Sequence, residues 1–289
     1  MRLRVLLTGA GGQLATDLAR ALNGRDLIAL SHRELEVCDP GQVRSALETV
    51  RPDVVINTAA FHRVDDCEAE AERAFAVNTL GVRNLALACA EAKASLLHIS
   101  TDYVFDGRKR QPYLEEDVAL PINVYGASKL AGELLIRALL ENHYIVRTSG
   151  LYGSAGASGK GGNFVNTMLR LAREGRDIKV VDDQCLSPTY TCDLAKRLAW
   201  LIGTESYGLY HVTNSGGCSW YEFACAIFEQ TGLRPRFEPT TTWAVGARAR
   251  RPAYSVLGHG SLERLGCDEL PHWSDALQRY LAEKGFVDS

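Results

Sequence analysis

An apolar run near the start of the chain passes directly into a glycine-rich turn. The stretch reads Leu3-Arg4-Val5-Leu6-Leu7-Thr8-Gly9-Ala10-Gly11-Gly12-Gln13-Leu14-Ala15. The apolar run predicts a strand, and the amphipathic pattern after the turn predicts a helix. Gly9 and Gly12 lie where the backbone must approach a pyrophosphate, because the lack of a Cβ permits both a tight turn and a close approach. Free N–H groups at the start of the helix suit an anion. The stretch therefore predicts a dinucleotide-binding turn.

The first half of the sequence alternates short apolar runs with amphipathic stretches, a pattern typical of a parallel sheet with helices on both faces. This indicates an α/β fold with a Rossmann-like, doubly wound parallel sheet in a dinucleotide-binding domain over residues 1–150. The expected strands are 3–8, 26–31, 54–58, 96–100 and 144–148, and the expected helices lie near 13–23, 40–50, 68–92 and 123–142.

A smaller C-terminal substrate-binding α/β region is expected in the second half. The small residues of 154–162 predict a boundary loop that closes over substrate, with a plain linker as the alternative. We expect residues 151–182 and 207–289 to bind substrate and residues 183–206 to pack back onto the first domain. The pattern there predicts helices at 163–174, at 191–202 and from Trp220, and strands at 178–181 and 208–213.

Composition excludes several classes of protein. With 46% hydrophobic and 23% charged residues the chain is ordinary for a folded globular protein, and its net charge of -3 gives no basic field for nucleic acid or an anionic membrane. The early glycine turn leaves no room for a signal peptide, and no apolar run is long enough to span a bilayer. We therefore expect a cytoplasmic protein without nucleic-acid or membrane partners. Its eight cysteines lack metal-ligand spacing, so no metal is assigned.

The end of the second expected strand bears on the choice of cofactor. It reads Ser31-His32-Arg33 and lacks the acidic residue that often binds a ribose 2′-hydroxyl, whereas Arg33 suits a 2′-phosphate. This favours NADPH. NADH stays open as well, since Arg33 can equally be a solvated charge and Glu34 or Glu36 can bind the adenosine.

Tyr125 and Lys129 are expected one turn apart on the same face of a helix. A protonated Lys129 would lower the pKa of Tyr125, which could then protonate a carbonyl oxygen while NAD(P)H supplies hydride. The spacing alone is common on exposed helices. The strand before this helix delivers Ser100 and Thr101 to the carboxyl end of the sheet, where such folds bind ligands. Thr101 is expected to polarise the carbonyl, with Ser100 as a competitor and a hydroxyl that satisfies local backbone groups as the plain alternative.

Three motifs together resemble the extended short-chain dehydrogenases, specifically the dTDP-4-dehydrorhamnose reductase family. They are Gly9-x-x-Gly12-Gln13-Leu14, Ser100-Thr101-Asp102-Tyr103-Val104-Phe105-Asp106-Gly107 and Tyr125-Gly126-x-Ser128-Lys129. The likeness covers nearly the whole chain. Further matches are Asn57-x-Ala59-Ala60, Val64-Asp65, Asn78, Val146-Arg147-Thr148-Ser149, Asn163-Phe164-Val165, Asp183-Gln184 with Ser187-Pro188-Thr189, and Arg251-Pro252 with Ser255.

This resemblance implies reduction at C4 of dTDP-4-dehydro-6-deoxy-L-mannose to dTDP-L-rhamnose, with a dTDP-sugar as the partner and a homodimer left open. It implies that Tyr125 is the general acid, that Lys129 orients it and binds the nicotinamide ribose, and that Thr101 holds the carbonyl or assists the delivery of the proton. The expected cofactor-binding residues are Gly9, Gly12, Gln13, Leu14, Ser31, Arg33, Glu36, Thr58, Ala59, Ala60, Asn78, Tyr125 and Lys129. The expected substrate-binding residues are Val64, Asp65, Thr101, Asp102, Tyr125, Gly150, Asn163 and Arg251.

Two positions depart from the family's pattern. Gly150 stands where many members carry Trp after the Arg-Thr-Ser run, so a wall that stacks on the sugar is expected to be missing, and Glu36 stands where Asp is frequent. Some members bind magnesium through acidic residues at a dimer contact. Asp17 lies at such a position, but a carboxylate near a helix start needs no metal to explain it, and magnesium stays unassigned.

The alternatives to this reaction belong to different classes. The same residues could reduce another nucleotide-linked 4-keto sugar, because they set the carbonyl chemistry and not the hexose. A non-catalytic regulatory subunit of the methionine adenosyltransferase type also resembles this family, although the complete catalytic set favours an enzyme. Epimerase and dehydratase activities are further options, and elimination is disfavoured because Tyr103 follows Asp102 where dehydratases carry Glu. The C-terminal residues that suit a thymine ring and a diphosphate are Trp220, Trp243, Arg248, Arg250, Arg251 and Tyr254, with Arg251 favoured.

Overall fold

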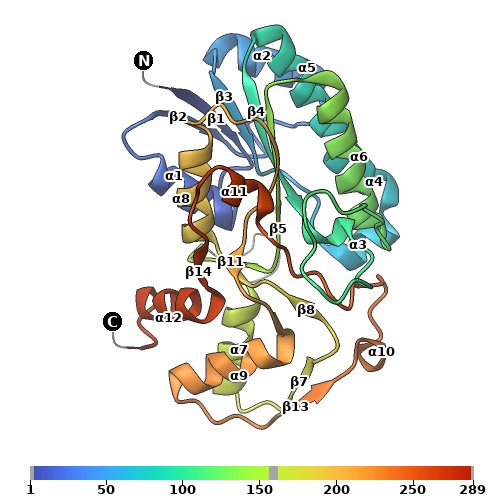
Figure 1. Cartoon of the computed structure of the whole chain (residues 1–289), viewed down its shortest axis with the longest axis vertical. Helices are drawn as coiled ribbons and strands as arrows, with labels where there is room; N and C mark the ends of the chain where they lie inside the picture. The colour runs from blue at the N-terminus through green and yellow to red at the C-terminus, as the bar shows by residue number, and fades with distance from the viewer. Residues whose placement is uncertain (1–2, 156–161, 288–289) are drawn as a thin grey trace.

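The computed structural model describes residues 3–155 and 162–287, and a six-stranded parallel sheet with the order β10-β5-β4-β3-β1-β2 forms its centre (Figure 1). From β1 the chain adds β2 on one side and β3, β4 and β5 on the other, so a crevice opens where the strand order reverses. The predicted doubly wound α/β fold is confirmed. The strands of this sheet are β1 (Arg4–Thr8), β2 (Asp26–Leu30), β3 (Val54–Asn57), β4 (Ser95–Thr101), β5 (His143–Thr148) and β10 (Gly208–His211).

Helices cover both faces of the sheet because alternate side chains of each strand point to opposite sides. In β1, Val5 and Leu7 join the cluster under α1 (Gln13–Ala21) and α8 (Thr191–Leu201), whereas Leu6 joins the cluster on the other face. That other face is covered by α2 (Pro40–Val50), α5 (Val82–Ala92) and α6 (Val124–Leu139) (Figure 1). The central strands are therefore apolar on both faces, which explains their nearly continuous hydrophobic runs.

The single helix predicted at 68–92 is wrong. The chain forms α3 (Val64–Ala69), α4 (Ala71–Phe75) and a π-helical segment η1 (Ala76–Gly81) before α5. Glu70 leaves the helical region between α3 and α4, and the Asn78 side chain in η1 bonds both the N–H and the carbonyl of Phe61. These contacts are tertiary, so the amphipathic pattern could not reveal the break.

The second half forms another apolar cluster below the sheet in Figure 1. It lies between α7 (Phe164–Arg173), α9 (Trp220–Thr231) and α12 (Trp273–Glu283), beside the paired strands β7 (Ile178–Val181) and β13 (Phe237–Thr240). The short elements are η2 (Asp102–Val104), β6 (Leu151–Tyr152), β8 (Cys185–Leu186), β9 (Thr189–Tyr190), β11 (Asn214–Ser215), β12 (Cys218–Ser219), α10 (Thr242–Val245), α11 (Gly260–Arg264) and β14 (Leu270–His272).

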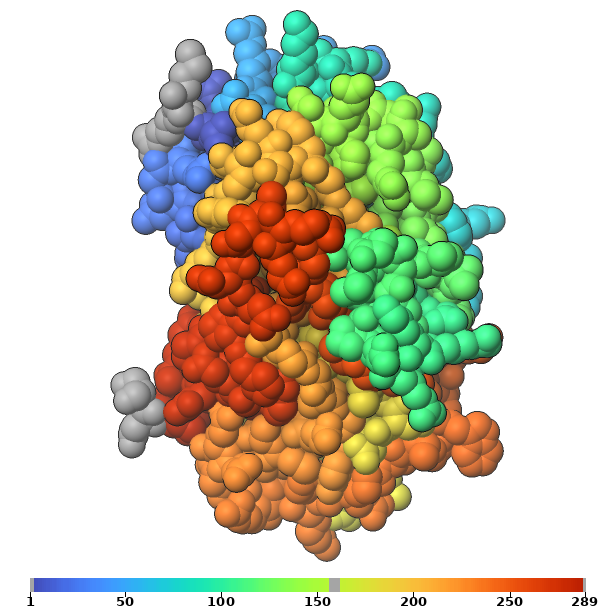
Figure 2. Space-filling model, in the orientation of Figure 1, coloured from blue at the N-terminus to red at the C-terminus, as the bar shows by residue number. Residues whose placement is uncertain are grey.

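The chain crosses between the two halves more than once. Helix α8 packs on α1, and β10, which lies in the segment expected to bind substrate, pairs with β5 as the outermost strand of the main sheet. Figure 2 shows C-terminal residues lying beside the green segment of the first half, where Tyr113 N–H donates to Val256 and Gly258 N–H donates back to Tyr113. The predicted domain boundaries stay predictions. Most of the predicted closing loop, 156–161, lies outside the described residues.

A buried ion pair joins α6 to the sheet. Arg147 of β5 donates from Nη2 and Nε to the Glu133 carboxylate at 2.7 and 3.0 Å, and the two side chains are only 4% and 2% exposed. The Ser100 hydroxyl also donates to Glu133, and the guanidinium lies 5.1 Å from the centre of the Phe105 ring. Because the charges are desolvated, either one is costly without its partner. Within the described residues no helix is both long and apolar enough to cross a membrane.

We predict that Arg147→Leu lowers the free energy of unfolding by about 3–5 kcal/mol, because it leaves the Glu133 carboxylate buried without its counter-charge. Urea unfolding followed by circular dichroism measures the change. Arg170→Leu is the matched control, since Arg170 pairs with Glu174 on an exposed helix face and its loss should cost no more than about 0.5 kcal/mol. Equal losses in the two variants would contradict this account of the buried pair.

Candidate active site

A cavity of about 880 Å³ lies at the carboxyl end of the sheet. Its walls come from the ends of β1, β3, β4 and β5, from the first turns of α1 and α6, and from α3, α7 and α9. Ligands of open α/β sheets bind at this place. The predicted residues that line it are Gly9, Gly12, Gln13, Leu14, Thr58, Ala59, Ala60, Val64, Asp65, Thr101, Asp102, Tyr125, Lys129, Gly150, Asn163 and Arg251.

Four predicted cofactor residues do not line this cavity: Ser31, Arg33, Glu36 and Asn78. Ser31 donates from its N–H and its hydroxyl to Glu34 at 2.8 and 2.6 Å, and Arg33 is exposed. Glu36 accepts a bond from the Cys38 N–H, and Asn78 also donates to Ser128. Roles for these four residues in cofactor binding stay predictions.

The glycine turn has the features that an anion site needs. Gly9 has a φ of +79°, and a Cβ there would lie 2.8 Å from the Ala59 nitrogen, so the turn packs directly against the chain that follows β3. Gly12 caps α1 without a side-chain hydrogen bond, which leaves the first N–H groups of the helix available. Gln13 donates to the Leu151 carbonyl, while its Oε1 is buried without a partner in the described part of the chain. These features fit the pyrophosphate of a dinucleotide.

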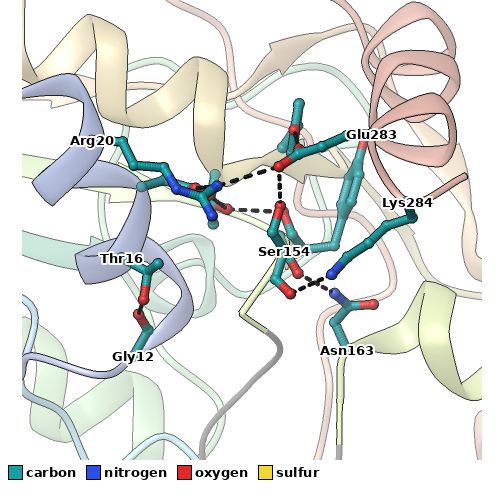
Figure 3. A network of polar contacts seen from close by, with 12 residues as sticks. Gly12, Thr16, Arg20, Ser154, Asn163, Glu283 and Lys284 are labelled. Carbon is teal, nitrogen blue, oxygen red and sulfur yellow. Dashed lines mark hydrogen bonds and ion pairs between the residues drawn. The ribbon is translucent and has the colours of Figure 1, made fainter. Parts of the chain in front are cut away.

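A polar network ties the C-terminal helix to the elements beside this turn (Figure 3). Glu283 near the end of α12 accepts from the Ser154 hydroxyl at 2.6 Å and from Arg20 of α1 at 3.3 Å. Lys284 donates to the Ser154 carbonyl at 2.6 Å, and Asn163 donates to the Gly153 carbonyl at 3.0 Å. The chain after β6 is thus bound to the end of α12 and to the N-cap of α7, and α12 is bound in turn to α1.

Asp17 of α1 is engaged by protein groups. The Thr191 hydroxyl donates to its carboxylate at 2.5 Å and Arg20 donates to it at 3.1 Å. Across residues 3–155 and 162–287 no three His, Cys, Asp or Glu side chains come together in a way that could hold a metal ion.

The start of α6 is positioned by its cap and by a glycine. The Asn123 side chain accepts from the Gly126 N–H at 2.7 Å and donates to the Arg250 carbonyl at 2.8 Å. A Cβ at Gly126 would lie 2.1 Å from the carbonyl oxygen of Tyr103, so only glycine allows the helix this close to η2. This approach brings Tyr125 beside the end of β4.

Tyr125 and Thr101 line the same cavity, and the buried carboxylate of Asp102 lies next to Thr101. Asp102 accepts from the hydroxyls of Thr101 at 3.0 Å, Ser149 at 2.8 Å and Ser255 at 2.5 Å. Burial raises the pKa of Asp102, and the three hydroxyl donors oppose that shift. Since the rival hydroxyl of Ser100 is turned to Glu133, the geometry favours Thr101 over Ser100 beside the phenol.

The predicted lowering of the Tyr125 pKa is wrong for this structure. Burial raises the pKa of Tyr125 above its usual value, and the nearby Thr101 hydroxyl only partly opposes this. Burial also lowers the pKa of Lys129 to about 7. The amine donates to the Ile99 carbonyl at 2.6 Å and lies 3.1 Å from His98 Nε2. Desolvation disfavours the charged form of both groups. The sequence pattern could not show how deeply the fold buries them.

Two residues expected to bind substrate are paired with each other. Arg251 Nη2 donates to Asp65 at 2.8 Å, and the Ala249 N–H donates to the same carboxylate at 2.9 Å. The Arg251 guanidinium holds the pKa of Asp65 below its usual range, against the opposing effect of partial burial. The ion pair fastens the segment after α10 to α3 at the rim of the cavity.

Aliphatic groups of Leu186 and Pro188 pack against Gly150, and Trp220 and Phe164 add aromatic rings to the cavity wall. Gly150 has a φ of +56°, and a Cβ there would lie 2.7 Å from Leu186 Cδ1 and 3.1 Å from Pro188 Cα. The aromatic surface of the cavity in this region comes from Trp220, whose ring lies 4.5 Å from that of Phe164. The expected absence of a stacking side chain at position 150 is therefore accompanied by an aromatic pair from α7 and α9.

Several lining residues were not assigned from the sequence. Tyr103, Ser149 and Phe164 lie inside the matched motifs, so their motif membership was a usable signal. Leu186 reaches the cavity only through the tertiary fold. Ser100, expected as the competitor of Thr101, and Trp220, expected to suit a thymine ring, also line the cavity. The remaining unassigned lining residues are Ala15, His62, Arg63, Asp66, Ile99, Thr148, Leu151, Gly162 and Thr167.

A Tyr-Lys pair on one helix, a threonine at the end of β4 and a dinucleotide turn after β1 together define an oxidoreductase of the extended short-chain dehydrogenase class. A family model described as the RmlD substrate binding domain matches residues 2–285. The chain belongs to this family, and the resemblance to dTDP-4-dehydrorhamnose reductases is confirmed.

Relatives match over nearly the full length of the chain. A spore coat polysaccharide biosynthesis protein, SpsK, of Bacillus subtilis (strain 168) is 45% identical, over 97% of this chain and 98% of its own. A dTDP-4-dehydrorhamnose reductase of Streptomyces griseus is 44% identical, over 96% and 92%. The crystal structure of dTDP-4-dehydrorhamnose reductase from Bacillus anthracis str. Ames in complex with NADP is 42% identical, with a TM-score of 0.94, over 98% and 100%.

We predict that Gly150→Ala destabilises the protein more than Gly175→Ala. Both glycines have positive φ, 56° and 64°, so each substitution should cost about 1–2 kcal/mol of backbone strain. Only at Gly150 does the new methyl group meet Leu186 and Pro188, which should add about 1–3 kcal/mol, whereas Gly175 has open space around it. Thermal and urea unfolding of the two variants measure the difference. An equal loss would show that position 150 has room for a side chain.

Proposed function

We propose that the chain reduces the C4 keto group of dTDP-4-dehydro-6-deoxy-L-mannose to give dTDP-L-rhamnose, with NADPH or NADH as cofactor. The observation that carries this proposal is that Tyr125, Thr101 and Lys129 lie together on the cavity that the glycine turn also lines. Family membership supports the same reaction, because relatives of matching length bear the name dTDP-4-dehydrorhamnose reductase.

The cofactor fits along the N-terminal end of α1. The turn at Gly9 and Gly12 would receive its pyrophosphate, and Lys129 would bind the nicotinamide ribose. When bound there, a reduced nicotinamide supplies the hydride for the carbonyl carbon. The choice between NADPH and NADH stays open, because Arg33, the residue that suits a 2′-phosphate, and its neighbour Ser31 are not part of the cavity wall.

Tyr125 acts as the general acid. Its raised pKa keeps the phenol protonated at neutral pH, so a proton is available for the oxygen that becomes negative during reduction. Thr101 lines the same cavity and would hold the substrate carbonyl or assist the delivery of the proton. Asp102, whose carboxylate is held by three hydroxyls, would lie against the sugar and keep Thr101 in place.

The substrate would extend from this centre toward the C-terminal elements. Arg251 supplies a cation for the diphosphate, and its pairing with Asp65 pre-positions it at the rim. Val64, Asn163 and Gly150 also line the cavity. A second candidate is the reduction of another nucleotide-linked 4-keto sugar, which is favoured by one observation: the small Gly150 where many family members carry Trp.

We predict that Tyr125→Phe lowers turnover by at least about 100-fold, because the proton donor is lost while the ring is kept. The assay follows oxidation of NADPH and of NADH by absorbance, with enzymatically generated dTDP-4-dehydro-L-rhamnose. Tyr207→Phe is the control, since Tyr207 is at the surface and away from the cavity, and its turnover should match that of the native protein.

Full turnover in Tyr125→Phe would remove Tyr125 from the mechanism. No turnover in the native protein, despite measurable binding of the cofactor, would reject this substrate and direct the assay to other 4-keto sugars. Co-purification with a methionine adenosyltransferase, without turnover of any keto-sugar, would favour a regulatory subunit instead.

We also predict that Trp220→Ala raises KM for the dTDP-sugar about fivefold, with a smaller change in kcat. Loss of an aromatic face from a pocket costs about 1 kcal/mol of binding, and Trp220 is remote from the proton donor in the sequence and lies on another element. Trp243→Ala is the matched control because this indole is 90% exposed. Steady-state kinetics of both variants make the comparison, and an unchanged KM in Trp220→Ala would contradict a contact with substrate.

A further inference from the structure

A buried row of polar side chains lies behind Lys129 and crosses three neighbouring strands. Thr8 of β1 donates its hydroxyl to Asn57 Oδ1 of β3 at 2.7 Å. Asn57 Nδ2 lies 3.0 Å from His98 Nδ1 of β4, and His98 Nε2 lies 3.1 Å from Lys129 Nζ. All four side chains are almost completely buried, and only Lys129 also lines the cavity. None of the mechanism above uses Asn57 or His98.

The orientation of the Asn57 amide follows from its neighbours. Its Oδ1 accepts from the Ala59 N–H at 3.0 Å as well as from Thr8. A backbone N–H can only donate, so the amide oxygen must face Ala59 and the amide nitrogen must face His98. Asn57 Nδ2 is therefore a donor, and His98 Nδ1 must be the acceptor.

This acceptor role determines the tautomer of His98. Burial is the larger of the two effects that lower the pKa of His98 well below its usual value, with the neighbouring Lys129 as the second, and the ring is therefore neutral. A neutral imidazole carries one hydrogen, and since Nδ1 accepts a bond from Asn57 the hydrogen resides on Nε2. His98 thus presents an N–H donor to Lys129.

An ammonium group at Lys129 does not fit this arrangement. It has three donors and no acceptor, so it would face the His98 Nε2–H with another N–H. An uncharged amine fits, because its lone pair accepts from His98 while one of its hydrogens is donated to the Ile99 carbonyl at 2.6 Å. Desolvation acts in the same direction, since it lowers the pKa of Lys129 to about 7.

We propose that Asn57 and His98 are positioning residues that hold Lys129 as an uncharged amine in the ligand-free protein. Protonation of Lys129 then takes one proton from solvent and requires His98 to move its own hydrogen from Nε2 to Nδ1. That move breaks the Asn57 hydrogen bond, because two donors would then face each other. The network stands on its own geometry, and only the catalytic meaning of Lys129 rests on the proposed function.

Other titratable groups surround Lys129 without replacing this control. Glu133, one turn further along α6, raises the pKa of Lys129, but its carboxylate is already bound by Arg147 and Ser100. Tyr125 is protonated because burial raises its pKa. Other titratable groups on the elements packed around this end of α6 are Asp102 and Tyr103 on η2 and Asp65, Asp66, Cys67 and Glu68 on α3. Glu68 accepts a hydrogen bond from the Val124 N–H at 2.9 Å, and Asp65 is paired with Arg251. Asp102 is bound by three hydroxyls, and burial raises the pKa of Tyr103.

The test replaces Asn57 with a side chain that can only accept. In Asn57→Asp the carboxylate requires a hydrogen on His98 Nδ1, which turns Nε2 into an acceptor for a charged Lys129. Nuclear magnetic resonance with ¹⁵N-labelled histidine and ¹³C-labelled lysine reports the tautomer and the charge directly. We expect the native protein to show the Nε2–H tautomer of His98 and a Lys129 titration near neutrality. In Asn57→Asp we expect the Nδ1–H tautomer and a proton affinity of Lys129 that is at least about tenfold higher.

His98→Gln provides a second variant in case Asn57→Asp does not fold. The amide oxygen of glutamine can accept from Lys129, so the same upward shift of the Lys129 titration is expected. His259→Gln is the control, because this histidine is also buried but bonds Thr213 away from the site, and the titration of Lys129 should not move. Chemical shifts lost in His98→Gln identify the His98 signals.

A native protein with His98 in the Nδ1–H form, or with Lys129 charged throughout the neutral range, would overturn the proposal. An unchanged Lys129 titration in folded Asn57→Asp and His98→Gln would do the same. These measurements need no substrate. Failure of the proposed reaction would therefore show in the turnover assay alone, and failure of this inference would show in the spectra alone.

Discussion

The register of α6 against the sheet is the constraint on which the site depends. Tyr125, Lys129 and Glu133 follow one another at intervals of four residues and share one face of the helix. Glu133 is bound by Arg147 of β5 in a buried, multiply hydrogen-bonded ion pair, so the helix can neither slide nor rotate without exposing an unpaired charge to an apolar interior. The same contact that fastens the helix therefore fixes where the phenol and the amine stand.

The burial of the reacting side chains is the second property that shapes the chemistry. Burial raises the pKa of Tyr125, so the phenol stays protonated, and it also raises the pKa of the Asp102 carboxyl. Burial lowers the pKa of Lys129 to about 7. A protonated phenol is the form that a reductase needs for its proton donor. The charge on Lys129, in contrast, depends on the donors and acceptors behind it, and these reach back through His98 and Asn57 to the first strand.

The C-terminal half completes the cavity. Some of its parts are held by ion pairs and hydrogen bonds, and others by packing alone. Arg251 is bound to Asp65 across the rim, and the end of α12 is bound to α1 and to the chain after β6 (Figure 3). Position 150, by contrast, has no room for a large side chain, because Leu186 and Pro188 occupy the space where its Cβ would lie. The aromatic surface is then offered by Trp220 and Phe164, which changes the place from which a sugar or a base can be contacted.

The sequence by itself determined the alternating α/β pattern, the glycine turn with its uncapped helix, and the placement of Tyr125, Lys129 and Thr101 at the carboxyl end of the sheet. Periodicity and glycine geometry are local properties, so they can be predicted from neighbouring residues. Only the tertiary structure decided that the stretch 64–92 breaks into three helices and a π-helical segment, that Trp220 and Leu186 reach the cavity, and that Asp65 pairs with Arg251. It also decided that the pKa of Tyr125 is raised and that the pKa of Lys129 is lowered. Burial and hydrogen-bond partners from distant strands set those properties, and no spacing along the chain records them.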